Sequence, residues 1–162
     1  SGQLPQADPA EQSSGLTVTR SDGSTFVLDE LQVLCQKGRS VADEESLLIV
    51  GYPAERPGLT FFMLEAVLSD IAQGATITLP PKGTPSRRFI LFVNDPETDN
   101  ELSSAEEESS GTVVVESASC DPKPTAMIHV DATLGSEMSD LPTADVSGTI
   151  VLSGSEPPVT EP

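Results

Sequence analysis

Five carboxylates in one acidic stretch of the chain have a spacing that could bind calcium. The stretch, NDPETDNELSSAEEESSG, covers residues 94–111 and has no basic residue. Calcium loops between two helices take oxygen ligands from positions 1, 3, 5, 7, 9 and 12, with glycine at position 6. Counted from Asp95, Ser103 stands at position 9 and Asn100, which tolerates a left-handed backbone, at position 6. The candidate calcium ligands are therefore the carboxylates at positions 1, 3, 5, 7 and 12: Asp95, Glu97, Asp99, Glu101 and Glu106.

The sequence on either side of this stretch favours a simpler interpretation. The preceding residues RRFILFVN and the following residues GTVVVES read as strands, whereas the calcium loop has a helix on each side. Pro96 at the second position is a further departure from the calcium pattern. The favoured interpretation is a solvated, Ser/Glu-rich connection between two strands that holds no cofactor. Calcium binding is the alternative.

His129 is the only histidine, and it lies in the sequence IHVDA two residues before Asp131. At this spacing on a strand the two side chains share a face, which allows an imidazole–carboxylate hydrogen bond. A hydrolase would also need a nucleophile, and no serine lies in a G-x-S-x-G turn. We therefore expect no catalytic residues, and a hydrolase that uses Asp and His is the third functional hypothesis.

Cys35 and Cys120 are the only cysteines, and they lie far apart in the sequence. The chain has no CxxC pair, which argues against a zinc or thioredoxin-like site. In an acidic, lysine-poor chain, two such cysteines favour a Cys35–Cys120 disulfide and an exported protein. The alternative is two separately buried thiols in the cytosol.

The composition describes an acidic chain with an aliphatic core. Hydrophobic residues make up 36% and aromatic residues 4% of the 162 residues, so Val, Leu and Ile must fill the core. The net charge of -18 repels phosphate groups, which argues against nucleic acid and anionic membrane surfaces as partners. No run of about 20 apolar residues is present, so we expect no transmembrane segment.

Short apolar stretches separated by Gly, Pro and Asp recur along the chain. Examples are LTVTR, ESLLIVGY, RRFILFVN, GTVVVES and TAMIHVDATL. Several of them alternate between apolar and polar residues, and no long helical pattern interrupts them. We predict an all-β fold: a single antiparallel β-sandwich or flattened barrel of about 8–9 strands, with at most one short helix.

The segment FFMLEAVLSDIAQG fits two descriptions. Its apolar residues recur at helical spacing, and Gly74 could end a helix. The rival description is a strand to about Leu68 followed by a tight turn. For residues 61–73 we favour a strand followed by one helical turn.

Both ends of the chain lack apolar periodicity. The first residues are rich in Pro, Gln, Ser and Glu, and the last residues have the same character. We predict a flexible N-terminal tether over residues 1–15, a β-sandwich domain over 16–152 and a flexible C-terminal tail over 153–162.

The C-terminal third of the chain resembles secreted or lipid-anchored bacterial β-sandwich proteins of unassigned function. The resemblance covers about residues 100–154 and rests on SGTVVVESASCDP, TAMIHVDATLGS and ADVSGTIVLSG. It implies a β-sandwich outside a cell and brings no catalytic motif. It also implies that the tether follows a lipid-modified cysteine preceding Ser1.

The preferred functional hypothesis is a non-catalytic exported or cell-surface domain of bacterial type with a binding or structural role. Its ligand is unknown, and we expect its partner to be another surface protein. The expected location is extracellular, periplasmic or on the outer surface, with the lipid-modified cysteine as an anchor. The alternatives are a calcium-stabilised adhesion-type module and the hydrolase.

Overall fold

The computed structural model describes residues 14–37, 44–53, 61–80, 89–138 and 140–154. The predicted tether and tail lie almost entirely outside these ranges. The elements are β1 (Gly15–Arg20), β2 (Thr25–Leu28), β3 (Glu30–Lys37), β4 (Glu45–Tyr52), β5 (Phe62–Val67), α1 (Leu68–Ile71), β6 (Ala75–Thr78), β7 (Phe89–Asn94), β8 (Glu101–Ser103), β9 (Ser110–Ser119), β10 (Thr125–Ser136) and β11 (Ala144–Ser153).

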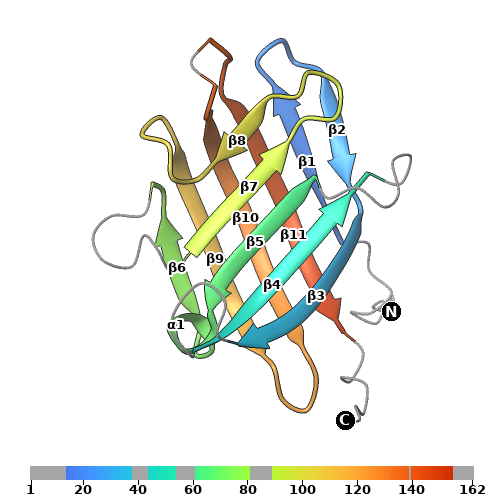
Figure 1. The fold of residues 1–162 in the computed structure, drawn as a ribbon, viewed down its shortest axis with the longest axis vertical. Helices are drawn as coiled ribbons and strands as arrows, with labels where there is room; N and C mark the ends of the chain where they lie inside the picture. The colour runs from blue at the N-terminus through green and yellow to red at the C-terminus, as the bar shows by residue number, and fades with distance from the viewer. Residues whose placement is uncertain (1–13, 38–43, 54–60, 81–88, 139, 155–162) are drawn as a thin grey trace, which may run out of the picture.

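The strands form two antiparallel sheets packed face to face (Figure 1). Sheet A has the order β2-β1-β11-β10-β9-β6, and sheet B has the order β3-β4-β5-β7-β8. The sheets join through β10, which pairs with β8 at Gly135 and Ser136 after it has paired with β9 and β11. The strand path is therefore nearly closed, and the predicted all-β antiparallel fold is confirmed.

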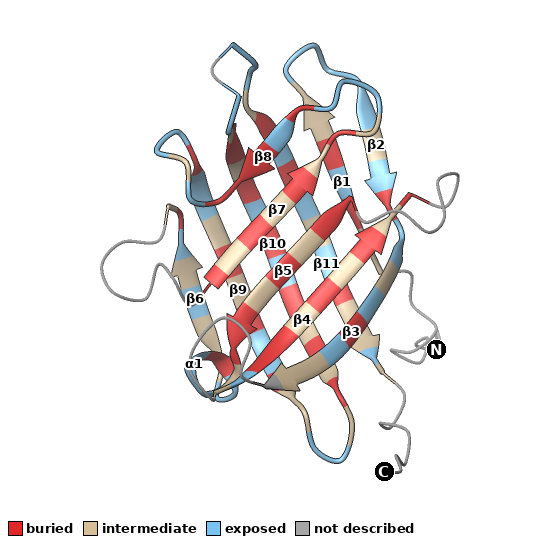
Figure 2. Cartoon of the chain, in the orientation of Figure 1, coloured by how far each residue is buried: buried red, intermediate tan, exposed pale blue. Residues whose placement is uncertain are grey.

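The core lies between the two sheets and is mainly aliphatic, as the composition predicted. Along β4, β5 and β7, buried residues alternate with half-buried ones, because successive side chains point to opposite faces of a sheet (Figure 2). The largest fully buried side chains are Phe62, Leu16, Leu28, Leu47, Ile49, Leu64, Ile71, Leu91, Leu102, Ile128, Leu134 and Ile150.

The segment at residues 61–73 is the predicted strand and helical turn. β5 ends at Val67, and α1 follows without a break. Ile71 of α1 is buried in the core, and Gly74 with φ of 91° turns the chain into β6. α1 spans four residues, and the described ranges contain no apolar helix of membrane-spanning length.

The sequence Ser-Gly-Thr occurs twice, at residues 110–112 and 147–149, and each glycine lies where two strands approach closely. Gly111 in β9 has φ of 94° and Gly148 in β11 has φ of 145°. A Cβ at Gly111 would collide with the carbonyl oxygen of Asp131 in β10, and one at Gly148 with that of Gly15 in β1. Both positions therefore require glycine because of backbone conformation and space.

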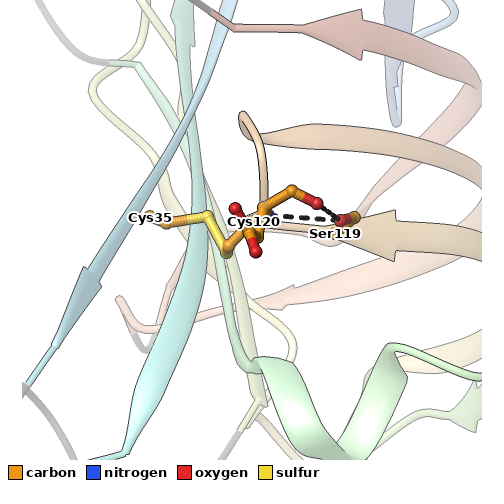
Figure 3. The surroundings of a disulfide bond; sticks show 4 residues. Cys35, Ser119 and Cys120 are labelled. Carbon is orange, nitrogen blue, oxygen red and sulfur yellow. Dashed lines mark hydrogen bonds between the residues drawn. A yellow bond between two sulfur atoms is a disulfide. The ribbon is translucent and has the colours of Figure 1, made fainter. Parts of the chain in front are cut away.

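Cys35 and Cys120 form a disulfide, as predicted (Figure 3). Cys35 lies in β3 of sheet B, and Cys120 directly follows β9 of sheet A, so the bridge links the two sheets covalently. The Cα atoms lie 6.0 Å apart, within the ordinary range for disulfides. Disulfides of this kind form in oxidising compartments.

Removal of the disulfide should destabilise the protein, because the bridge joins residues 85 positions apart. The chain-entropy model gives about 4.6 kcal/mol as an upper value for a loop of this size. We expect the Cys35→Ser/Cys120→Ser variant to lose about that free energy of unfolding in urea denaturation. Wild-type protein under thiol reductant is the matched control and should lose the same amount. A loss below about 1 kcal/mol, the size of an ordinary single mutation, would contradict this role.

Candidate functional site

Four connections between strands meet at one end of the sandwich, the upper end in Figure 1. They join β1 to β2, β7 to β8, β8 to β9 and β10 to β11. We refer to this region as the acidic loop end, because its connections carry these acidic residues: Asp22, Asp95, Glu97, Asp99, Glu106, Glu107, Glu108, Glu137 and Asp140.

A buried ion pair joins Arg20, the last residue of β1, to Asp95, the first residue after β7. The Nε and Nη2 groups of Arg20 donate hydrogen bonds to the two carboxylate oxygens of Asp95 at 2.6 and 3.0 Å. The side chains are only 13% and 4% exposed. The guanidinium carbon also lies 4.8 Å from the ring centre of Phe26 in β2. This two-point contact fixes both groups and holds sheet A to sheet B at this end.

The Asp95 carboxylate also organises the turn that follows it. Its Oδ1 accepts hydrogen bonds from the backbone N–H groups of Glu97 and Thr98 at 2.8 and 3.3 Å. Burial raises the pKa of Asp95, but hydrogen bonds from Arg20 and these two amides, with the charge of Arg20, outweigh burial and hold the pKa below its ordinary value. The hydrogen bond with Asp95 in turn raises the pKa of Arg20. Both groups therefore remain charged at neutral pH.

Asn100 links this turn to the connection between β10 and β11. It is 6% exposed. Its Nδ2 donates to the carbonyl oxygen of Pro142 at 2.9 Å, and its Oδ1 accepts from the hydroxyl of Ser136 at 2.5 Å. The buried amide thus bonds through both its nitrogen and its oxygen, as buried polar groups require.

Three buried serines connect β8 to the rest of the structure. The hydroxyl of Ser104 accepts from the N–H of Leu91 at 3.0 Å. The hydroxyl of Ser109 donates to the carbonyl oxygen of Ser103 at 2.8 Å and accepts from the N–H of Gly135 at 2.9 Å. These hydroxyls take the place of backbone partners, so the connection between β8 and β9 is bonded to the sheets.

These contacts show that the interpretation of residues 94–111 as a solvated connection is wrong. The stretch contains the strand β8 and several buried polar residues. Sequence reasoning missed them because their partners are distant: Arg20 lies 75 residues before Asp95, and Ser136 lies 36 residues after Asn100. The sequence contained one sign that this stretch packs against the core: Leu102, its only leucine, which is buried in the structure.

The five candidate calcium ligands do not converge on one point. The Asp95 carboxylate is bound to Arg20, and Glu97, 72% exposed, lies 3.5 Å from the same guanidinium. In the part of the chain that the structure describes, ligand-type atoms of three side chains come within 4.8 Å of one another only in Cys35, Glu45 and Cys120. Those sulfurs form the disulfide and are not thiolate ligands. The spacing of the five carboxylates in the sequence resembles a calcium loop, but the fold does not bring them together as calcium ligands.

Glu137 lies close to two of the candidate carboxylates. Burial raises its pKa, and the charges of Glu101 and Glu106 raise it further, against a hydrogen bond with Ser103 that lowers it. The backbone N–H of Glu137 donates to the carbonyl oxygen of Glu101 at 2.7 Å, which fixes the spacing. Like charges held together in this way disfavour the ionised form of Glu137.

His129 contacts residues that the sequence did not suggest. Its Nδ1 lies 3.2 Å from the hydroxyl of Thr149 in β11, and its Nε2 lies 3.3 Å from the carboxylate of Glu116 in β9. Asp131 lies on the same outer face of sheet A as His129, as the two-residue spacing predicted. The imidazole contacts Thr149 and Glu116 in place of the hydrogen bond to Asp131 that the sequence allowed. The imidazole is thus an exposed cross-strand partner.

Asp131 instead lines a shallow depression of about 410 Å³ on the outer face of sheet A. Thr133 and Asp145 line it as well, and the hydroxyl of Thr133 donates to Asp145 Oδ1 at 2.7 Å. Carboxylates beside hydroxyls in an open depression can accept hydrogen bonds from a ligand. The depression lacks the water-excluding enclosure of an enzyme pocket.

The sequence matches no protein-family model, no curated protein and no solved structure.

The Asp95→Asn variant should lose about 2 kcal/mol of unfolding free energy at neutral pH, because it removes a charged hydrogen-bond acceptor from a buried cation. The matched control is Glu97→Gln, which removes an exposed carboxylate near the same guanidinium and should cost less than about 0.5 kcal/mol. Equal losses in urea denaturation of the two variants would contradict the structural role of the buried pair.

The pH dependence of the Asp95→Asn effect follows from the lowered pKa of Asp95. Such a carboxylate stabilises the fold above its unfolded pKa of about 3.9, and this stabilisation is lost as the pH falls through the lower folded pKa. The stability difference between wild type and Asp95→Asn should therefore be constant near neutral pH and shrink in acid. A difference that grows in acid would contradict the assignment.

The Glu137→Gln substitution should change the free energy of unfolding in the opposite direction to Asp95→Asn. A raised carboxyl pKa means that folding opposes ionisation, so Glu137 destabilises the fold at neutral pH and ceases to do so as the pH falls below its pKa. We expect a gain of about 0.5 kcal/mol at neutral pH, the size usual for surface charges. Urea denaturation measures it, and a loss of stability at neutral pH would show that Glu137 makes a favourable interaction instead.

Proposed function

We propose that the chain is an exported, non-catalytic binding domain of bacterial type, held at a cell surface by its N-terminal segment. The observation that carries the proposal is the structural use of Asp95, the buried carboxylate of the acidic loop end. The carboxylate of Asp95 bonds to Arg20 and to backbone amides, so it is engaged in holding the structure. Binding requires no further chemistry from these groups, whereas catalysis would require a free acid or base.

The disulfide supports export. It links the two sheets at the end away from the acidic loop end, and a bridge of this kind forms in an oxidising compartment. Extracellular or outer-surface location and lipid anchoring are part of the proposal.

The chemistry of the remaining polar groups favours binding over hydrolysis. His129 lies between the hydroxyl of Thr149 and the carboxylate of Glu116, and all three side chains are exposed to solvent on the outer face of sheet A. Asp131 and Asp145 lie at an open depression that solvent enters. Enzyme sites gather such groups in a pocket that excludes water.

A substrate screen tests the proposal. Incubation of the protein with pooled ester, glycoside, peptide and phosphate substrates should give no turnover above that of buffer. The control variant is His129→Ala, which removes the only imidazole from an exposed position. Turnover that disappears in His129→Ala would refute the non-catalytic assignment and favour the hydrolase hypothesis.

Thermal unfolding separates this proposal from the calcium-stabilised adhesion-type module. The melting temperature should be the same in chelator and in millimolar calcium, because Arg20 already neutralises Asp95. A melting temperature that rises with calcium in the wild type, but not in Glu101→Gln/Glu137→Gln, would favour the calcium module.

A further inference from the structure

A carboxylate lies against the disulfide, at the end of the sandwich away from the acidic loop end. It belongs to Glu45. One of its oxygens and the sulfur atoms of Cys35 and Cys120 lie within 4.8 Å of one another. Neither the covalent link between the sheets nor the proposed binding function uses this carboxylate. We refer to Cys35, Glu45 and Cys120 as the sulfur–carboxylate cluster.

Strand register explains why Glu45 reaches the disulfide. Cys35 in β3 is opposite Leu47 in β4, and Glu45 precedes Leu47 by two residues. Residues two apart on a strand share a face, so Glu45 points to the same side of sheet B as Cys35. The Cα atoms of such diagonal neighbours lie about 7–8 Å apart, within reach of a long side chain. Cys120 approaches from sheet A, so the cluster draws on both sheets (Figure 3).

Reduction of the disulfide turns the cluster into a set of metal ligands. With a phosphine as the reductant, phosphorus gives up two electrons and takes the oxygen of one water, and the two protons of that water go to the two sulfurs. A divalent cation then displaces the two thiol protons and binds two thiolates and the carboxylate of Glu45. A newly synthesised chain holds the same two thiols before the disulfide forms.

The dimensions of the cluster fit a tetrahedral ion. Zinc bonds of about 2.3 Å to sulfur and about 2.1 Å to oxygen place the ligand atoms roughly 3.5–3.8 Å apart. The three ligand atoms already lie within 4.8 Å, so the sulfurs need only move apart once their bond is broken. Rotation about the Cα–Cβ bonds of Cys35 and Cys120 supplies this movement while their Cα atoms stay 6.0 Å apart.

The exposure of the three residues leaves a way in for the ion. Glu45 is exposed, and the two cysteines are half-buried. Three protein ligands with water in the fourth position are an established arrangement for zinc. The absence of a CxxC pair argued against zinc from the sequence, but the third ligand here comes from β4, which only the fold brings beside the cysteines.

The charge and type of the ligands determine which ion fits. Two thiolates and a carboxylate carry three negative charges in a chain whose net charge is already -18, so a cation reduces the repulsion. Thiolates are soft ligands and favour zinc and related ions, whereas calcium and magnesium favour oxygen ligands alone.

We propose that the reduced protein binds one thiophilic divalent cation, of which Zn²⁺ is the type, at Cys35, Glu45 and Cys120. The ion and the disulfide are alternative links between the two sheets at the same place. When a two-electron oxidant such as another disulfide takes one electron from each thiolate, the S–S bond forms, the oxidant leaves as two thiolates and the cation is released. The inference does not depend on the proposed function.

Titration of the phosphine-reduced protein with Cd²⁺, a spectroscopic substitute for Zn²⁺, tests the proposal. The ultraviolet thiolate-to-cadmium charge-transfer band should grow and saturate at one ion per chain. Glu45→Gln should weaken the binding at least tenfold, about 1.4 kcal/mol. The matched control is Glu44→Gln, which removes a carboxylate that accepts from the hydroxyl of Ser69 and should bind Cd²⁺ like wild type. A reduced wild type without the band would refute the proposal, as would equal affinities in Glu45→Gln and wild type.

Thermal unfolding with Zn²⁺ gives a second measurement, which does not depend on the folding of Glu45→Gln. An ion that binds the folded state raises the melting temperature. We expect Zn²⁺ to raise the melting temperature of the reduced wild type and to leave that of the oxidised wild type and of Cys35→Ser/Cys120→Ser unchanged. Equal rises in all three would show that the acidic surface binds Zn²⁺ elsewhere, and no rise in the reduced wild type would show that the cluster does not bind it. Both results would overturn the proposal.

Discussion

The buried ion pair between Arg20 and Asp95 is the interaction on which the acidic loop end depends. A carboxylate that is 4% exposed is costly unless charge and hydrogen bonds compensate for lost water. Arg20 supplies two hydrogen bonds and the opposite charge, and the N–H groups of Glu97 and Thr98 supply two more bonds. Because Asp95 is satisfied in this way, the turn after β7 has one defined shape, and Asn100 and the serines of β8 can make their own buried bonds.

The ion pair and the disulfide together connect the two sheets at both ends. Arg20 belongs to sheet A and Asp95 follows a strand of sheet B, whereas Cys35 lies in sheet B and Cys120 follows a strand of sheet A. Between these links the core is mainly aliphatic. A chain with few aromatic residues buries less area per side chain, so polar and covalent links between the sheets add stability that packing alone would not supply.

Alternation in the sequence was sufficient for the fold class but not for the site. TAMIHVDATL alternates between apolar and polar residues and ESLLIVGY contains a short continuous apolar run, and these segments form β10 and β4. The partner of Asp95 cannot be read locally, because β1 is brought beside β7 only by the fold. Spacing alone also grouped Asp95 with Glu101 and Glu106. In the fold, Asp95 bonds to Arg20, whereas Glu101 and Glu106 lie near Glu137.

Hydrogen exchange of the backbone amides at residues 95–109 tests most directly whether the acidic loop end belongs to the folded body. The N–H groups of Glu97 and Thr98 donate to the Asp95 carboxylate, and those of Ser104 and Ser109 donate to backbone carbonyls. The account predicts that these amides exchange far more slowly than unprotected amides, as amides of core strands do. Exchange at the rate of an unstructured chain, in a protein whose strands remain protected, would contradict it.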